Sequence, residues 1–458
     1  MGLAAGLAAC SDNQTSAPAL PPDVQSVIFL QRSARNSNGN VFDYTSYVPG
    51  ARLVKLEPPS ADGKLTVLTS DPMWQSADIM AWDLSFDAKS VVFSARLADS
   101  NRFHLFSMNV DGTNPKQLTE GDYDYVYPVF LPGQKLMFMT SKNVEDGVAQ
   151  FQDEYERQVT AQVGIMNMDG TGEELGPRNV SHRVSPAVMP DGNVMYTEWR
   201  HLGDVNDGHL RMMNPDMTKM REAFGGEDGG KGGTNSYLKA RFVETYQMAD
   251  GRTADRVVAV ATSRDRTLQA GKLYLIDLGA SEEASRFIDL TPLVPGDRVR
   301  SQAGVGRYYD AEVVGDPAKR TFLVSWADGA VESEALAMAT TNANFGLYVF
   351  DATSGQRFPL YDDPTFWDVL ARPVKARPEP VVTASPVQGD SFVVSAINVY
   401  NSSVTTIDAG AAVKVRLIEG FSAEEGPRTF GTTEFDGQSL YGEVPVQADG
   451  SFAARVPA

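Results

Sequence analysis

The chain has 458 residues, of which 42% are hydrophobic and 22% charged, and its formal net charge is −19. This length favours two domains or one large repeat array over a single small domain. The excess of negative charge excludes a protein that binds nucleic acid through its phosphates. No run of about 18 apolar residues occurs, which excludes a membrane-spanning helix.

Residues 1–23 are interpreted as a truncated lipoprotein signal peptide and a flexible tether. The first ten residues, MGLAAGLAAC, end in Leu7-Ala8-Ala9-Cys10. This ending resembles the lipobox of bacterial lipoproteins, in which the cysteine becomes the lipid-attachment site. We therefore expect a lipid on Cys10 and a location in the periplasm or at the outer membrane. A chance alanine-rich leader with a stray cysteine is the alternative. With one cysteine, a disulfide within the chain is excluded.

Residues 24–372 contain a repeated pattern of short strands. The segments 84–96, 129–142 and 187–200 each read as a strand, a turn of Asp, Pro or Gly, and a second strand rich in Val, Phe, Met and Tyr. A third strand follows each of them, in the segments 103–109, 163–168 and 209–214. Weaker copies occur at 27–69, 256–278 and 321–351.

A turn phrase follows the third strand of the unit. MNVDGTNPKQLTEG begins at 108, MNMDGTGEELG at 166 and MNPDMTKMREAFGG at 213. The Asn-x-Asp-Gly residues tolerate positive φ and predict a hairpin to a fourth, outer strand. Four-stranded antiparallel units at this spacing are typical of an all-β propeller. We predict six blades and leave seven open.

The segment GDYDYVYP (121–128) precedes the innermost strand of one blade. Asp122, Tyr123, Asp124 and Tyr125 would form a polar, aromatic rim at the mouth of the central channel, suited to contact a ligand or a protein segment. SHRVSP (181–186) and residues 306–312 occupy the same position in other blades. Alternatively, these residues only close the channel with hydrogen bonds.

The histidines offer a weak metal site. His201 and His209 flank two aspartates, but loop residues at this spacing have no fixed geometry, so we expect no metal. Neither a Gly-x-Ser-x-Gly elbow nor a Ser/His/Asp set can be assigned, and the sequence identifies no catalytic residue.

The segment 373–382 has the composition of a semi-rigid, proline-rich linker. Strands without the blade pattern follow in 391–400, 411–420 and 441–458. They predict a separate β-sandwich-like domain over 383–458. This domain ends on VPA without a polar tail, so we expect it to be truncated.

The blade pattern resembles the propeller of the Tol-system periplasmic protein. The set of LSFDAKSVVFSAR, QLTEGDYDYVYPVFLPGQKLMFMTSK, DGNVMYTEWR and LYDDPTFWDVLARPVKARPEP resembles the hydrazine synthase alpha subunit family more closely. That resemblance implies a propeller, a middle domain and c-type haems bound by Cys-x-x-Cys-His. This chain lacks that motif, so any haem would have to lie beyond Ala458, and we expect the chain to be a fragment.

The sequence supports two hypotheses about the function of the chain. The first is a lipid-anchored envelope propeller that binds a protein partner without catalysis, without a cofactor and with no membrane contact besides its anchor. The second, which rests on the resemblance, is the non-haem scaffold of a hydrazine-synthase-like redox subunit, whose partners would be the other subunits of the complex.

Overall fold

The structure is a computed structural model. It describes residues 18–35, 43–142, 152, 158–176, 181–202, 205–225, 233–248, 251, 253–264, 269–279, 284–296, 305–332, 343–381, 391–401, 408–422 and 436–457. Among them, no helix has the length and apolar character needed to cross a membrane. Cys10 lies outside the described residues.

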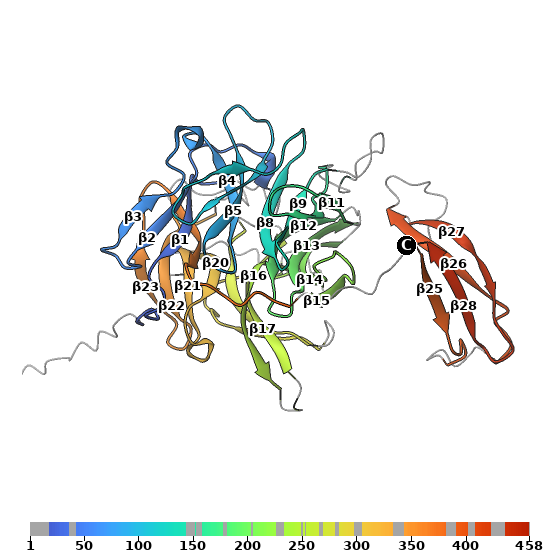
Figure 1. Ribbon diagram of the computed structural model, residues 1–458. Coiled ribbons are helices and arrows are strands. Elements are labelled where there is room, and N and C mark those ends of the chain that lie inside the picture. The colour runs from blue at the N-terminus through green and yellow to red at the C-terminus, as the bar shows by residue number, and fades with distance from the viewer. Residues whose placement is uncertain are drawn as a thin grey trace, which may run out of the picture.

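In the described part of the chain, 24 strands form six antiparallel blades around a central axis (Figure 1). This confirms the predicted all-β propeller and decides for six blades over seven. Blade 1 is β24 (Trp367–Pro373), β1 (Val27–Arg32), β2 (Arg52–Glu57) and β3 (Lys64–Val67). Blade 2 is β4 (Asp78–Leu84), β5 (Ser90–Arg96), β6 (His104–Asn109) and β7 (Lys116–Gln117). Blade 3 is β8 (Tyr125–Leu131), β9 (Lys135–Thr140), β10 (Gln162–Asn167) and β11 (Glu174–Leu175).

The remaining blades follow in chain order. Blade 4 is β12 (His182–Val188), β13 (Val194–Leu202), β14 (Val205–Met213) and β15 (Arg221–Phe224). Blade 5 is β16 (Ser236–Gln247), β17 (Thr253–Thr262), β18 (Lys272–Asp277) and β19 (Arg286–Asp289). Blade 6 is β20 (Arg307–Val313), β21 (Thr321–Ala327), β22 (Gly346–Asp351) and β23 (Gln356–Tyr361). Short 3-10 turns lie at Asp43–Thr45, Pro72–Trp74 and Pro317–Lys319.

The second strand of a blade is buried on both faces because neighbouring blades pack against it from each side. All residues of β1 and β21 are buried, as are all but the ends of β5. This burial explains why VIFLQR, SVVFSAR and TFLVSWA read as continuous apolar runs instead of alternating ones.

The ring closes between the two ends of the propeller sequence. β24 is the innermost strand of blade 1 and pairs antiparallel with β1, with Gln31 opposite Asp368. The Gln31 side chain donates a hydrogen bond of 2.7 Å to the Asp368 carboxylate across this seam. Blade 1 therefore combines residues from both ends, which the sequence pattern did not predict.

The hairpin turns have the predicted geometry. Gly112 and Gly170 have φ of +86° and +89°. In each turn the aspartate two residues before the threonine accepts the threonine N–H, at 3.0 Å for Asp111 and for Asp169. The third copy has the same hydrogen bonds with Met217 at φ +65° in place of glycine.

The innermost strand of every blade contains a β-bulge at its middle. The register shifts at residues 80–81 of β4, 127–128 of β8, 185–186 of β12, 239–240 of β16, 309 of β20 and 370–371 of β24. Four of these positions have left-handed φ of +52° to +57°: Tyr127, Ser185, Lys239 and Leu370. Bulges re-aim side chains at barrel rims and next to functional sites.

The segment after β24 is held against the propeller. Residues 374–381, here called the strap, cross the front of the propeller in Figure 1. The backbone N–H of Arg377 donates to the carbonyl of Phe86 at 2.8 Å, and Glu379 accepts the N–H of Gly133 at 2.8 Å. The strap thus contacts blades 2 and 3, whereas the sequence predicted a linker.

The last four strands form two antiparallel pairs. β25 (Ser391–Ala396) pairs with β28 (Phe452–Pro457), and β26 (Lys414–Ser422) pairs with β27 (Asp436–Pro445). None of them pairs with a propeller strand within the described residues. A small β-domain over 383–458 remains our interpretation of these pairs.

Candidate functional site

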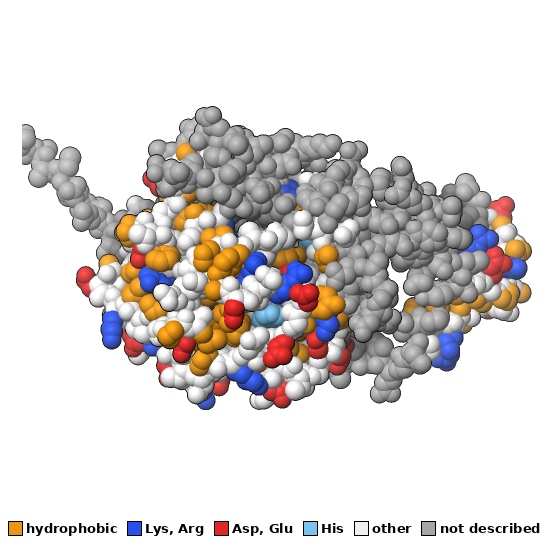
Figure 2. Space-filling view, turned by 90° about the horizontal axis from the view of Figure 1, so that it is seen from above, with side chains coloured by type: hydrophobic (Ala, Val, Ile, Leu, Met, Phe, Trp, Pro, Cys, Tyr) orange, Lys and Arg blue, Asp and Glu red, His pale blue; other side chains and the backbone are white. Residues whose placement is uncertain are grey.

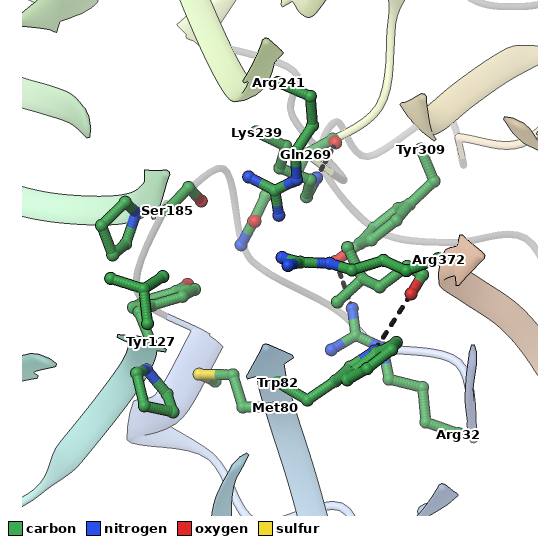
Figure 3. A pocket seen from close by; sticks show the side chains of 14 residues that line it. Arg32, Met80, Trp82, Tyr127, Ser185, Lys239, Arg241, Gln269, Tyr309 and Arg372 are labelled. Carbon is green, nitrogen blue, oxygen red and sulfur yellow. Dashed lines mark hydrogen bonds between the residues drawn. The ribbon is translucent and has the colours of Figure 1, made fainter. Parts of the chain in front are cut away.

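The bulges of the six innermost strands meet in the central channel. Their first residues are Met80, Tyr127, Ser185, Lys239, Tyr309 and Leu370, and all six line one cavity of about 30 Å³ (Figure 3). Most of the remaining wall consists of Arg32, Trp82, Arg241, Gln269 and Arg372. The space is large enough for a water molecule or a small ion. Because each blade contributes one bulge, the channel wall is assembled from residues as far apart in the sequence as Arg32 and Arg372.

One layer of the channel wall is cationic and aromatic. The Lys239 ammonium lies 3.7 Å from the ring centroid of Tyr309 and donates to the carbonyl of Gln269 at 2.6 Å. Arg32 donates to the Tyr309 hydroxyl and lies over the same ring. Both cations are more than 90% buried, so cation–π contacts replace part of their lost hydration.

The bulged backbone is held by side chains of neighbouring strands. The indole N–H of Trp82 donates to the carbonyl of Leu370 at 3.0 Å, and the buried Asp310 carboxylate accepts the Leu370 N–H at 2.8 Å. Burial raises the pKa of Asp310, and the Leu370 N–H partly offsets this. These bonds keep Leu370 at positive φ.

Charged pairs occupy the end of the channel near the strap. Arg241 lies 3.5 Å from Glu312, and Asp83 forms ion pairs with Arg372 and, at 3.6 Å, with Arg377. Burial on its own would raise the pKa of Asp83, but the charges of Arg372 and Arg377 together lower it. Asp83 is therefore a carboxylate at neutral pH.

The four predicted rim residues lie apart from the channel wall. Asp122, Tyr123 and Asp124 line a separate cavity of about 410 Å³ between blades 2 and 3, together with Tyr44, Thr45, Arg96, Asn101, Arg102, Ser141, Gln158 and Val159. Asp122 is exposed and lies 3.7 Å from Arg102. None of the four rim residues lines the channel cavity, and their contact with a partner stays a prediction.

The other two members of the rim have structural contacts. Asp124 accepts the Phe103 N–H at 2.9 Å and pairs with Arg102 at 3.1 Å, and burial raises its pKa. Tyr125 is 2% exposed, packs against Phe138 and does not line the cavity. Burial, with Glu173 nearby, raises the pKa of the Tyr125 hydroxyl.

The two histidines proposed as weak metal ligands lie on neighbouring strands. His209 is buried in β14, with its imidazole 3.4 Å from Asp207 and 3.3 Å from Glu222. His201 lies in β13, and its side chain is outside the described residues. Among the described residues, no group of three or more His, Cys, Asp and Glu has the arrangement of a metal site.

Sequence reasoning missed the channel wall. One signal was available, because Pro128 and Pro186 lie inside innermost strands, where proline is found at bulges. Nothing comparable marks Lys239, Arg241 or Arg372, which lie in unremarkable polar positions of the sequence.

Among the described side chains visible in Figure 2, basic and acidic groups are interspersed and form no continuous basic patch. A phosphate backbone would require such a patch. The absence of a nucleic-acid partner stays a prediction from the net charge of −19.

Comparison with known proteins identifies the fold and no family. No protein-family model matches the sequence, and no curated protein matches it. Among solved structures, hydrazine synthase of Kuenenia stuttgartiensis is similar with a TM-score of 0.68 at 16% identity, covering 95% of this chain. The chain spans 64% of the length of that protein.

Two further structures match less closely. TolB from Acinetobacter baumannii has a TM-score of 0.43 at 10% identity, covering 77% of this chain and 67% of its own. The nidogen/laminin complex has 0.44 at 10%, covering 77% of this chain and 99% of its own. The TM-score of 0.68 supports the predicted resemblance to hydrazine synthase at the level of the fold alone.

Proposed function

We propose that this β-propeller is a binding platform of the bacterial envelope, held to a membrane by a lipid on Cys10, that recognises a protein partner and performs no chemistry itself. The cavity between blades 2 and 3 is the observation that carries this proposal. It combines an exposed carboxylate, Asp122, with an aromatic ring, Tyr123, and two arginines, Arg96 and Arg102. Aromatic residues and arginine are enriched where proteins bind one another.

On one side of the cavity the side chains are accessible to a partner, and on the other side they are held by hydrogen bonds within the protein. Asp122 is exposed and Tyr123 half-buried, whereas Asp124 accepts a backbone N–H and its own N–H donates to Ser141 at 2.9 Å. Partner contact is therefore assigned to Asp122 and Tyr123, while Asp124 positions the loop. The test therefore changes Asp122 and Tyr123 and leaves Asp124 unchanged.

The test is a pull-down from envelope extract with three forms of the purified chain. The wild type and an Asp62→Ala control, altered at an exposed turn of blade 1, should capture the same partners. An Asp122→Ala, Tyr123→Ala double variant should lose them. Identical captures by all three forms would remove this cavity as the contact site.

The second candidate function is the non-haem scaffold of a hydrazine-synthase-like complex. The similarity to hydrazine synthase over 95% of this chain favours it, although that likeness concerns the fold. Haem chemistry would then belong to sequence beyond residue 458, since the chain has one cysteine. The gene sequence after codon 458 tests this candidate: a Cys-x-x-Cys-His motif would support it, and a stop codon would reject it.

A further inference from the structure

A larger cavity lies where the strap covers the end of the channel. Its volume is about 680 Å³, within the range of small-molecule sites. Its lining includes the last two residues of β4, β12 and β20, the middle of β16 at Phe242, and strap residues Lys375 to Val381. The strap is therefore one wall of this cavity, here called the compartment.

Positive charge is concentrated along this compartment. The two channel cavities are lined by six cations, Arg32, Lys239, Arg241, Arg372, Lys375 and Arg377, and by three carboxylates, Asp83, Glu312 and Glu379. The whole protein carries −19. A cationic interior in an acidic protein attracts anions, because low-dielectric walls focus the field of the lining charges.

The carboxylates that line the cavities offset only part of this charge, and Lys375 pairs with Asp23, which lines neither cavity. Asp83 is shared between Arg372 and Arg377, and Glu379 accepts a backbone N–H of Gly133. Glu312 is the partner of Arg241 at 3.5 Å, beyond the length of a strong charged hydrogen bond. Among the charges that act on the pKa of Arg241, the repulsion from Arg372 has the largest effect, ahead of the attraction of Glu312, Asp83 and Asp310.

Arg241 and Arg372 lie at the junction of the two cavities, because both line each of them. In Figure 3 their guanidinium groups are directed toward each other in the middle of the channel. Burial, followed by repulsion from Arg372, lowers the pKa of Arg241 to about 10. Two converging guanidinium groups match the oxygen atoms of a carboxylate or phosphate.

The rest of the large cavity is mostly apolar. Phe86, Val129, Val188, Met189, Phe242 and Val314 line it together with prolines of the strap. An occupant therefore needs an apolar body as well as an anionic group.

We propose that this compartment is a binding site for a small amphipathic anion, whose carboxylate or phosphate group lies between Arg241 and Arg372 and whose apolar body fills the space beneath the strap. The site depends neither on the rim cavity nor on the lipid anchor.

Calorimetric titration of the wild-type chain tests the site directly. The probes are octanoate, octyl phosphate, octylammonium and octanol, which share one apolar body and differ in the head group. Octanoate or octyl phosphate, or both, should bind with one ligand per chain, and the tighter of the two identifies the head group. Octanol and octylammonium should bind at least tenfold more weakly. Absence of anion binding, or equal binding of all four probes, would overturn the proposal.

A pair of arginine variants then locates the site. Arg241→Gln should weaken binding of the preferred anion at least tenfold. Arg256→Gln is the matched control, since Arg256 is half-buried and ion-paired with Glu244 and Asp277 but lines neither cavity. Unchanged affinity in a folded Arg241→Gln protein would contradict the proposal. Should that variant fail to fold, the head-group comparison in the wild type still decides.

Discussion

Gly112 shows how one residue fixes a turn of blade 2 that packs against blade 1. Its φ is +86°, and a Cβ atom there would lie 2.6 Å from the carbonyl oxygen of Leu68 in blade 1. Gly170 has the same relation to Leu118 of blade 2. The glycine therefore serves both the hairpin and the close approach of the neighbouring blade.

Gly112→Ala should lower the free energy of unfolding by more than Gly355→Ala does. Gly355 also has positive φ, +73°, but a Cβ atom there meets nothing within 4 Å. Left-handed strain alone costs about 1–2 kcal/mol, and only Gly112 adds a backbone clash. Chemical denaturation of both variants measures the difference. Equal losses would mean that the approach to Leu68 is not a constraint.

The protonation of Asp368 makes the stability of the seam between β24 and β1 depend on pH. The Asp368 side chain is buried in this seam and accepts hydrogen bonds from Gln31 and from the N–H of Asp363, each 2.7 Å long. Burial raises its pKa to about 7, although the two hydrogen bonds oppose the shift. The folded protein therefore holds a proton on Asp368 that the unfolded chain releases near pH 4.

Stability should consequently fall between pH 4 and pH 7. Because the pKa of Asp368 is higher in the folded than in the unfolded chain, protonation of Asp368 stabilises the fold. This stabilisation is fully present below the unfolded pKa of 3.8 and is lost as pH rises through the folded pKa of about 7. It amounts to about 4 kcal/mol at 1.4 kcal/mol per pKa unit. Asp368→Asn should reduce the difference in melting temperature between pH 5 and pH 8. A difference equal to that of the wild type would show that Asp368 does not titrate in this range.

The strap shows how an element that reads as a linker becomes part of the propeller. Its N–H groups at Val374 and Arg377 donate to carbonyls of Ser26 and Phe86, each within 2.9 Å. The Arg377 guanidinium also donates to the Leu84 carbonyl at 2.7 Å. Lys375, by contrast, is about half exposed and pairs with the equally exposed Asp23.

Arg377→Ala should loosen the strap while leaving the blades intact. Amide hydrogen exchange of a peptide covering 374–381 should be slow in the wild type and at least tenfold faster in the variant, since the guanidinium contacts to Leu84 and Asp83 are lost. Lys375→Ala is the control and should exchange like the wild type, because exposed ion pairs contribute little. Unchanged exchange in Arg377→Ala would mean that other contacts hold the strap.

At the scale of the whole molecule, the propeller is a ring closed by strands from its two ends. The seam between β1 and β24 brings residues 27–32 next to residues 367–373. Residues 1–17, which include Cys10, lie outside the described residues, so lipid attachment has to be tested by expression.

Expression of the full-length gene in a bacterium with labelled palmitate tests the anchor. The wild-type chain should incorporate the label, and Cys10→Ala should not, since the chain has no other thiol. Cys10→Ala should retain the melting temperature of the wild type, because the ring begins only at Val27. Label retained in the variant would reject lipid attachment at this residue.

The sequence by itself determined the local structure of the propeller. The Asn-x-Asp-Gly phrases set hairpins through positive φ, and continuous apolar runs marked strands buried on two faces. Both features act over a few residues, so a linear pattern records them. Their repetition was enough to predict an all-β propeller.

Only the tertiary structure decided the blade count, the seam, the strap and the channel. Six bulges, the first at residue 80 and the last at residues 370–371, converge on one axis. Arg241 meets Arg372 there although no spacing in the sequence relates them. The rim segment shows the converse, since Tyr125 reads as a surface aromatic and is buried against Phe138. Contacts between blades depend on how the ring closes, and closure joins segments more than 300 residues apart, which no local pattern encodes.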